Sequence, residues 1–154
     1  MLLLLILLLL ALARGALDPA TCAADGPCKH PTDVVVQTLL PGSGPPVLTS
    51  HEYAAHVTLY IEADGGELTP SGWSTRKADG AARDEPFRFQ PGRNLIEGWT
   101  EGVLKMREGE RARLHVPSKK GYGAQEVGQK GAEGGFYIPP NADLLFDIEV
   151  LGKN

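Results

Sequence analysis

The sequence predicts an α+β fold in which an antiparallel sheet of about five strands wraps around one short α-helix. Apolar and polar residues alternate along most segments after residue 32, as they do in strands that bury one face. One segment, residues 94–109, instead repeats its apolar side chains at helical spacing. The 154-residue chain also contains 19 glycines and 12 prolines, which favour turns over a helical bundle. Its length is sufficient for one domain with its own core.

Five segments are predicted as the strands of this sheet: residues 33–40, 52–62, 86–89, 110–116 and 143–151. In the second segment, one face carries Tyr53, Ala55, Val57, Leu59 and Ile61. In the fourth, the residues expected to point inward are Ala112, Leu114 and Val116, and those expected to point outward are Arg111, Arg113 and His115. The last segment places on one face Leu144, Phe146, Ile148 and Val150. These inward faces are the predicted core.

The helical segment has one apolar face formed by Ile96, Trp99, Val103 and Met106. Asn94 is its expected N-cap with Glu97 as a capping-box partner, and Gly109 is its expected stop. Gly98 and Gly102 lie inside it, and each costs about 1 kcal/mol of helix stability relative to alanine. We therefore expect the helix to be stabilised by packing on the sheet, with the glycines where the backbones approach.

Two long stretches, residues 63–85 and 118–141, show no regular pattern. Loops of this length in a compact domain are usually functional or disordered. The second stretch ends in Phe136, Tyr137 and Ile138 followed by two prolines, which form a rigid corner before the last strand. These three side chains either close one end of the core or line a pocket.

The N-terminus has the pattern of a secretory leader. About a dozen apolar residues are followed by the sequence ALA, so residues 1–16 are predicted to be a cleaved signal peptide. A membrane anchor is the alternative, but the apolar run stops at Arg14, short of the roughly 20 residues that a stable span needs. Residues 17–32 are then an N-terminal arm and residues 33–154 the folded domain. The expected location is the secretory pathway, either the endoplasmic reticulum lumen or outside the cell.

Two cysteines, Cys22 and Cys28, flank a short turn sequence in the arm. In an oxidising compartment a disulfide between them is the expected state. The alternative is a metal site with His30 as a third ligand, but a fourth ligand is missing and the spacing does not fit a zinc ribbon.

Several function classes lack support in the sequence. A net charge of −4 without a basic stripe argues against nucleic-acid binding. No nucleophile elbow, phosphate-binding loop, zinc-protease motif or paired CxxC is present, so no cofactor or metal is expected. His56 is interpreted as a structural histidine, and His30, His51 and His115 as solvated; the carboxylates are interpreted as solubilising. Rotation about an X-Pro bond is a reaction that needs no such groups, since no covalent bond forms or breaks.

Several motifs in the second half of the chain occur in a familiar order. The stretches PFRF, LIEGWTEGVLKMREGERARLHVPSKKGYGA and YIPPNADLLFDIEVL resemble the FKBP family of peptidyl-prolyl isomerases, in sequence and in spacing. The likeness spans residues 34–151 and is most specific from Pro86 onward. It implies an FKBP-like curved sheet around a short helix, and an apolar aromatic pocket that binds proline.

The resemblance also assigns site residues in this sequence. It implies that Trp99 forms the floor of the pocket, and that Ile96, through its backbone N–H, and Tyr122, through its hydroxyl, bind ligand carbonyl groups. The implied walls and rim are Trp73, Phe87, Leu95, Tyr137, Ile138, Phe146 and, in place of a family tyrosine, Val57. A tyrosine at position 57 is expected to improve ligand binding if this strand register holds.

Some positions depart from the family pattern. The family's pocket aspartate corresponds to Ser74, with Asp79 or Asp84 as alternatives, and the flap at residues 125–136 is long and rich in glycine. The predicted function is that of a monomeric peptidyl-prolyl cis-trans isomerase, with reduced activity, that assists folding of proline-containing clients and binds macrolides such as tacrolimus and rapamycin. The alternative is a catalytically weak FKBP-like module that binds peptides or ligands.

Overall fold

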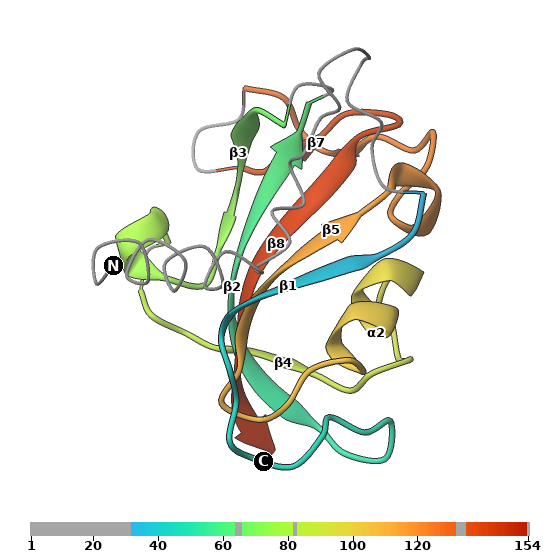
Figure 1. Cartoon of the computed structure of the whole chain (residues 1–154). Coiled ribbons are helices and arrows are strands. Elements are labelled where there is room, and N and C mark those ends of the chain that lie inside the picture. The colour runs from blue at the N-terminus through green and yellow to red at the C-terminus, as the bar shows by residue number, and fades with distance from the viewer. Residues whose placement is uncertain (1–31, 64–65, 82, 132–134, 154) are drawn as a thin grey trace, which may run out of the picture.

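The computed structural model describes residues 32–63, 66–81, 83–131 and 135–153 (Figure 1). Its main sheet is antiparallel and has six strands, in the order β1-β5-β8-β2-β3, with β4 paired to the same edge of β2 as β3. The strands are β1 (Val35–Leu40), β2 (Tyr53–Glu62), β3 (Leu68–Ser74), β4 (Phe87–Phe89), β5 (Arg111–Val116) and β8 (Asp143–Lys153). The predicted fold class, a sheet wrapped around one short helix, is confirmed.

The centre of the sheet is the long antiparallel pair β2 and β8. Their register runs from Tyr53 opposite Lys153 to Glu62 opposite Asp143, with one irregularity after Ala54. The residues predicted to face inward on β2, β5 and β8 are buried, as the period of two in the sequence required. The one exception is Ile61, which is only half-buried near the end of β2.

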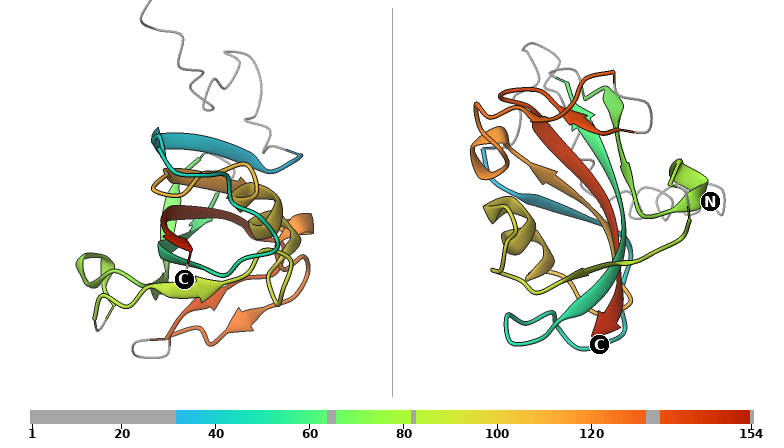
Figure 2. Two further views of the ribbon diagram at one scale, coloured as in Figure 1. Left: turned by 90° about the horizontal axis from the view of Figure 1, so that it is seen from below. Right: turned by 180° about the vertical axis from the view of Figure 1, so that it is seen from behind.

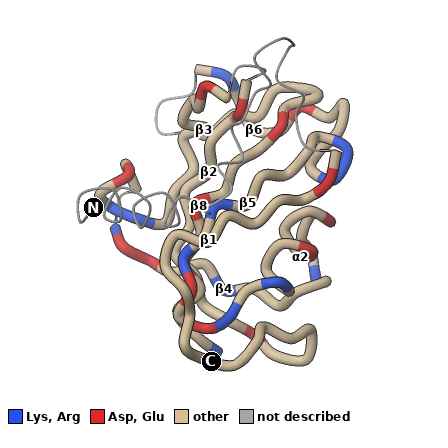
Figure 3. Tube along the Cα trace, viewed as in Figure 1, with Lys and Arg blue, Asp and Glu red and all other residues tan. Residues whose placement is uncertain are grey.

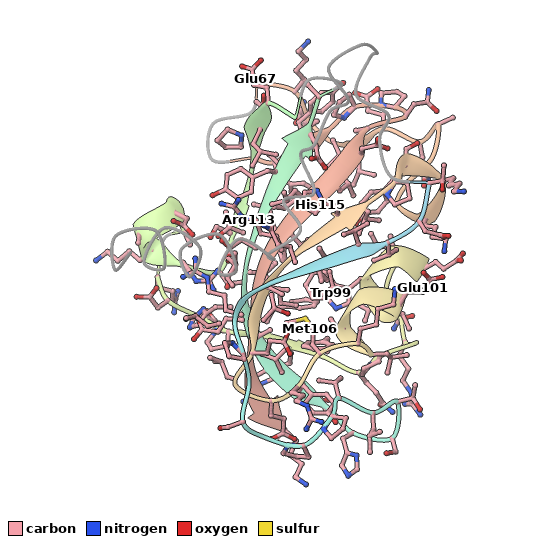
Figure 4. The ribbon with its side chains drawn as sticks, viewed as in Figure 1. Glu67, Trp99, Glu101, Met106, Arg113 and His115 are labelled. Atoms are coloured by element: carbon pink, nitrogen blue, oxygen red, sulfur yellow. The ribbon has the colours of Figure 1, made fainter. Side chains whose placement is uncertain are left out.

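The helix α2 (Glu97–Val103) lies in the concave face of the curved sheet, as both views of Figure 2 show. Trp99 and Met106 project between this helix and the sheet (Figure 4). A Cβ atom on Gly98 would overlap Val116 Cγ1, and one on Gly102 would lie 2.8 Å from Leu114 Cδ1. The two glycines therefore allow the helix to approach β5 closely, as predicted.

The helix is shorter than the sequence pattern suggested. Its N-cap is Ile96, not Asn94, and no side chain caps it. Asn94 instead adopts a left-handed backbone conformation with φ 51°, which asparagine tolerates better than most residues, so its side chain is not placed to cap the helix. Gly109 also lies beyond the end of the helix, in the turn that leads into β5, with φ 79°.

The two stretches without a regular pattern contain structure that the sequence analysis missed. Residues 63–85 include β3 and the single-turn 3-10 helix η1 (Lys77–Asp79), and residues 118–141 include η2 (Ser118–Lys120) and the small pair β6 (Val127–Gly128) and β7 (Tyr137–Ile138). The β3 segment contains Pro70 and Gly72, which are unfavourable in strands. Its pairing with β2, which is irregular between Thr58 and Tyr60, supplies what local propensity does not.

The outer face of the sheet is more ordered than expected. His115 was predicted to be solvated, but its Nδ1 lies 3.0 Å from Glu62 Oε2 and both side chains are largely buried (Figure 4 labels His115). Asp147 is only 8% exposed and receives two hydrogen bonds from Arg111, at 2.9 and 3.1 Å. The interpretation of His115 as solvated was wrong, and so was that of Asp147 as a solubilising carboxylate. Pairs such as these form only once distant strands are side by side. Elsewhere acidic and basic residues are interspersed along the chain (Figure 3).

The predicted signal peptide, the arm and both cysteines lie outside the described residues. In the part of the chain that the structure describes, no helix has the length and apolar character needed to cross a membrane.

Candidate active site

A cavity of about 380 Å³ opens between the start of helix α2 and the strands that face it. Its lining residues come from β2, β3, β4, β8, helix α2 and three loop segments, and they are mostly aromatic or aliphatic: Leu59, Trp73, Phe87, Asn94, Leu95, Ile96, Trp99, Tyr122, Phe136 and Phe146. Its size is within the usual range of small-ligand sites, and so is its apolar lining with a few polar groups.

Aromatic rings packed edge to face form the inner end of the cavity. The Trp99 ring lies 5.0 Å from the Phe146 ring at an interplanar angle of 78°, and 5.8 Å from the Phe87 ring at 71°. Trp73 extends the series, 5.8 Å from Phe87 at 84°. Edge-to-face contacts of this kind are favourable, so the rings support one another and form a preformed surface.

Trp99 is buried to 3% exposure by this packing. Its indole Nε1 is buried without a hydrogen-bond partner among the described residues. The rings that surround the indole belong to Phe87, Phe89 and Phe146, and they present π faces and C–H edges rather than hydrogen-bond acceptors. A tryptophan indole in such surroundings offers a flat apolar face to a ligand.

The polar groups of the cavity are few. Tyr122 contributes a hydroxyl, which carries its proton at neutral pH as any tyrosine does, and its burial raises the pKa of that group further. Asn94 contributes an amide. Ile96 is the N-cap of α2, a position next to backbone N–H groups that have no partner within the helix.

The segment that carries Tyr122 is held in place from two sides. The Nζ of Lys120 lies 2.8 Å from Glu101 on helix α2 and 2.7 Å from Asp33 ahead of β1. The N–H of Gly123 donates to the carbonyl of Ser118, which closes the turn around Tyr122. These contacts link the tyrosine to the helix that carries Trp99.

The structure brings most of the predicted site residues together. Seven of them line the cavity: Trp73, Phe87, Leu95, Ile96, Trp99, Tyr122 and Phe146. Val57 does not, because it is fully buried in the core, opposite Ile148 of β8. Leu59, one strand period further along β2 and opposite Phe146, lines the cavity instead.

The sequence left open whether residues 136–138, before the two prolines, close the core or line a pocket, and the structure shows both. Phe136 lines the cavity, whereas Ile138 is buried in the core at 1% exposure. Tyr137 is half-buried outside the lining, with Lys130 Nζ 6.0 Å from its ring centre. Alternation places Leu59 two residues after the core residue Val57, and Phe136 two residues before the core residue Ile138. It does not show that these two side chains reach the cavity.

The three candidates for the family's pocket aspartate are engaged elsewhere. Ser74 and Asp79 both bond to the hydroxyl of Thr58, at 2.9 and 2.6 Å. Asp84 accepts the N–H of Lys77 at 2.8 Å. No carboxylate is among the described residues that line the cavity. Over the same described ranges, no cluster of three His, Cys, Asp or Glu side chains is arranged to hold a metal ion.

Comparison with known proteins assigns the chain to a family. The family described as FKBP-type peptidyl-prolyl cis-trans isomerase matches residues 53–151 of the chain. The chain belongs to this family. The predicted enzyme class, a peptidyl-prolyl cis-trans isomerase, is thereby confirmed, and the aromatic cavity is the candidate active site of an FKBP domain.

Individual relatives agree with this assignment. The chain is 39% identical over 116 residues to peptidyl-prolyl cis-trans isomerase FKBP12 of Arabidopsis thaliana, a match that covers 75% of this chain and 93% of the relative. It is 42% identical over 73 residues to FK506-binding protein 2 of Dictyostelium discoideum, covering 47% and 50%. The crystal structure of AtFKBP13 has a TM-score of 0.63 and 26% identity, covering 84% of this chain and 99% of that one.

Proposed function

We propose that this FKBP domain accelerates rotation about X-Pro bonds by holding the prolyl ring in the aromatic cavity, against Trp99. The observation that carries this proposal is the set of edge-to-face rings around Trp99 that closes one end of a cavity of about 380 Å³. A proline ring is compact and apolar, and such a cavity removes it from water without requiring a charged partner.

The barrier to rotation is about 18–20 kcal/mol and comes from amide resonance. A twisted amide has lost that resonance and carries less charge on its oxygen than the planar one. An apolar cavity that strips water from the carbonyl therefore favours the transition state over the ground state. The reaction needs no nucleophile and no proton transfer, which agrees with the uncharged lining.

Two donors orient the substrate in this proposal. The hydroxyl of Tyr122 donates to a substrate carbonyl from its half-buried position, and the backbone N–H of Ile96 donates to a second carbonyl at the mouth. Asn94, beside Ile96 at the same rim, provides a further polar contact for the peptide. These donors fix the peptide around the bond that rotates.

The proposal is tested by a protease-free isomerisation assay with a peptide that has a bulky apolar residue before proline. The wild-type chain should accelerate the reaction, which without a catalyst takes on the order of tens of seconds or longer. A Trp99→Ala variant, confirmed as folded by circular dichroism, should lose most of this acceleration, and Tyr122→Phe should lose part of it. A wild-type rate equal to the uncatalysed rate would instead support a weak binding module, which the uncharged lining also permits.

The same cavity is proposed to bind macrolides. Relatives named for FK506 binding support this, and so does the apolar lining. Tacrolimus and rapamycin should inhibit the isomerase reaction. Because no lining carboxylate is present among the described residues to accept a ligand hydroxyl, their affinity should be weaker than in a domain that has one.

The domain is proposed to act on clients in the secretory pathway, because the first 16 residues resemble a signal peptide. The proposal includes a disulfide between Cys22 and Cys28. Intact-mass measurement of freshly secreted protein after alkylation should show no added label until a reductant is supplied. Labelling of both cysteines before reduction would exclude the disulfide and argue against the oxidising compartment.

A further inference from the structure

A second hollow, of about 910 Å³, lies directly against the aromatic cavity. Trp73 and Phe87 line both, so their two rings, 5.8 Å apart, form the partition between them. Beyond this partition the hollow continues as an open groove past Ser74 and Thr75 on one side and Pro86 and Arg88 on the other. Of the groove residues beyond the partition, only Ser74 was considered for the isomerase site, as the counterpart of the family's pocket aspartate, and its hydroxyl is bonded to Thr58 instead.

The groove is shaped by the described parts of the connection between β3 and β4, residues 75–81 and 83–86. This connection carries η1 away from the sheet before it returns to β4, as Figures 1 and 2 show. Hydrogen bonds hold its start and end near β2: Thr75 Oγ1 accepts the N–H of Val57 at 2.8 Å, and the N–H of Glu85 donates to the carbonyl of Thr75 at 3.2 Å. Asp79 in η1 is tied to β2 by its bond with Thr58. The groove is therefore a built feature of the fold.

Three charged residues line the groove: Arg83, Glu85 and Arg88. Arg83 is paired with Glu85 at 3.8 Å, and the two side chains are 82% and 74% exposed. Arg88 is paired with Glu52 at 3.8 Å, again between exposed side chains. Exposed pairs at such distances contribute little. Both guanidinium groups are therefore available to a ligand carboxylate, for which the arginine fork is well suited.

We propose that this groove binds the residues that flank the proline in the substrate polypeptide, and that it selects an acidic side chain among them. The proposal rests on the proposed function, since the groove acts as an extension of the isomerase site. Its occupant is the same chain that places its proline in the cavity, because the groove begins where the cavity ends, at Trp73 and Phe87. An extended chain advances about 3.3–3.6 Å per residue, so two or three residues suffice to pass this partition.

The net charge of the groove lining favours an acid over a base. Two arginines and one glutamate are the charged residues of the lining, and Glu52, the partner of Arg88, lies outside it. A substrate lysine would meet both arginines, whereas a substrate carboxylate would displace the long, exposed contacts that Glu85 and Glu52 now make. The groove thereby supplies sequence preference that an apolar cavity alone does not.

The test measures kcat/KM of the full chain with peptides that share one apolar residue before proline and carry Glu, Gln or Lys two or three residues away, on either side. On the side of proline that enters the groove, kcat/KM of the Glu peptide should be about fivefold higher than that of the Lys peptide. A favourable exposed charge pair at the upper end of its usual strength produces a difference of this size. This ratio should fall towards one in 0.5 M salt because exposed charges are then screened. A ratio of one at low salt would overturn the proposal.

Charge-reversal variants locate the effect. Arg83→Glu and Arg88→Glu should each reduce the preference, and the double variant should reverse it. Glu85→Gln should strengthen it. Arg107→Glu is the matched control, since Arg107 is an exposed arginine that lines neither the groove nor the cavity, and it should leave the preference unchanged. An equal effect of the control variant would mean that net charge, and not the groove, sets the preference.

The Gln peptide separates this proposal from the proposed function. Its side chain is uncharged, so its turnover should change much less than that of the Glu peptide in the Arg83 and Arg88 variants. If it is not turned over by any of them, the isomerase proposal fails; if it is turned over while the Glu preference does not respond to Arg83 or Arg88, only the groove proposal fails. A matched acidic peptide with glycine in place of proline should compete weakly, and strong competition would overturn the idea that one polypeptide occupies both hollows.

Discussion

Tyr122 is the residue whose role is most open to a direct test. It lines the cavity from a turn rather than from the core, and burial raises the pKa of its hydroxyl, which is a proton donor at neutral pH. Tyr122→Phe removes one donor and leaves the ring, so ligand affinity should fall by about 1 kcal/mol or somewhat more. Calorimetric titration with tacrolimus and a thermal unfolding curve measure the two effects separately, and the melting temperature should change little.

Phe146→Ala provides the contrast to this variant. Phe146 lies on the central strand β8, is 3% exposed and packs on Trp99. Its truncation should cost about 3–5 kcal/mol of unfolding free energy, because a large buried ring is replaced by a cavity. If Tyr122→Phe lowers the melting temperature as much as it lowers affinity, Tyr122 is a structural residue.

Val57 shows where residue-level inference from the sequence stopped. The motif alignment placed it at the pocket, and alternation correctly placed it on the inward face of β2. The inward face contains both core and cavity positions, and only the curvature of the sheet decides that Leu59 reaches the cavity while Val57 does not. Such curvature depends on packing between distant strands, which a local pattern does not contain.

Val57→Tyr is therefore expected to do the opposite of what the motif suggested. The side chain at position 57 is fully enclosed, opposite Ile148. A tyrosine there overpacks the core and should lower the free energy of unfolding by about 1–3 kcal/mol. Guanidinium unfolding measures this loss, and macrolide affinity, measured on the folded fraction, should not improve. A gain in affinity with unchanged stability would restore Val57 to the site.

At the scale of elements, the strands with clear alternation and the helix were predictable from the sequence. The short strands β6 and β7 were not, because two residues carry no period. The start of α2 was misplaced because Asn94, a good capping residue by type, adopts a left-handed backbone in the turn before the helix. In each case a tertiary contact or a turn outweighed local propensity.

The packing of α2 on β5 gives an element-scale prediction. Alanine normally stabilises a helix relative to glycine by about 1 kcal/mol. At Gly98 the added Cβ would overlap the stiff, β-branched Val116, which is buried in the core. Gly98→Ala should therefore lower stability by about 1–3 kcal/mol in spite of the helix propensity. In Gly102→Ala the added Cβ meets the end of the more adaptable Leu114 side chain, so the loss of stability should be smaller. Urea unfolding of the two variants measures both losses. The reverse order would show that α2 does not sit as closely on β5 as described.

At the scale of the whole molecule, the outer face of the sheet joins segments that are far apart in the sequence. Asp147 of β8 receives hydrogen bonds from Arg111 of β5 and lies 3.9 Å from Arg76, which follows β3. Arg76 also donates to the carbonyl of Asp147 and to Glu149. No sequence pattern connects these positions, so the carboxylates were interpreted as merely solubilising.

Asp147→Asn tests whether this network stabilises the fold. The carboxylate is the acceptor for two bonds from Arg111, whose pKa is raised mainly by the hydrogen bond with Asp147. Replacing the carboxylate by a neutral amide leaves Arg111 and Arg76 facing each other without a charge between them. We expect a loss of about 1–2 kcal/mol of unfolding free energy. This is below the value for a fully buried pair, because Arg111 is 38% exposed.

Glu149→Gln on the same strand is the matched control: Glu149 is more exposed, and its one ion pair among the described residues is with Arg76, so the loss should stay below about 1 kcal/mol. Chemical unfolding at low salt and at high salt measures both, and equal losses in the two variants would show that burial of Asp147 adds nothing to its pairing.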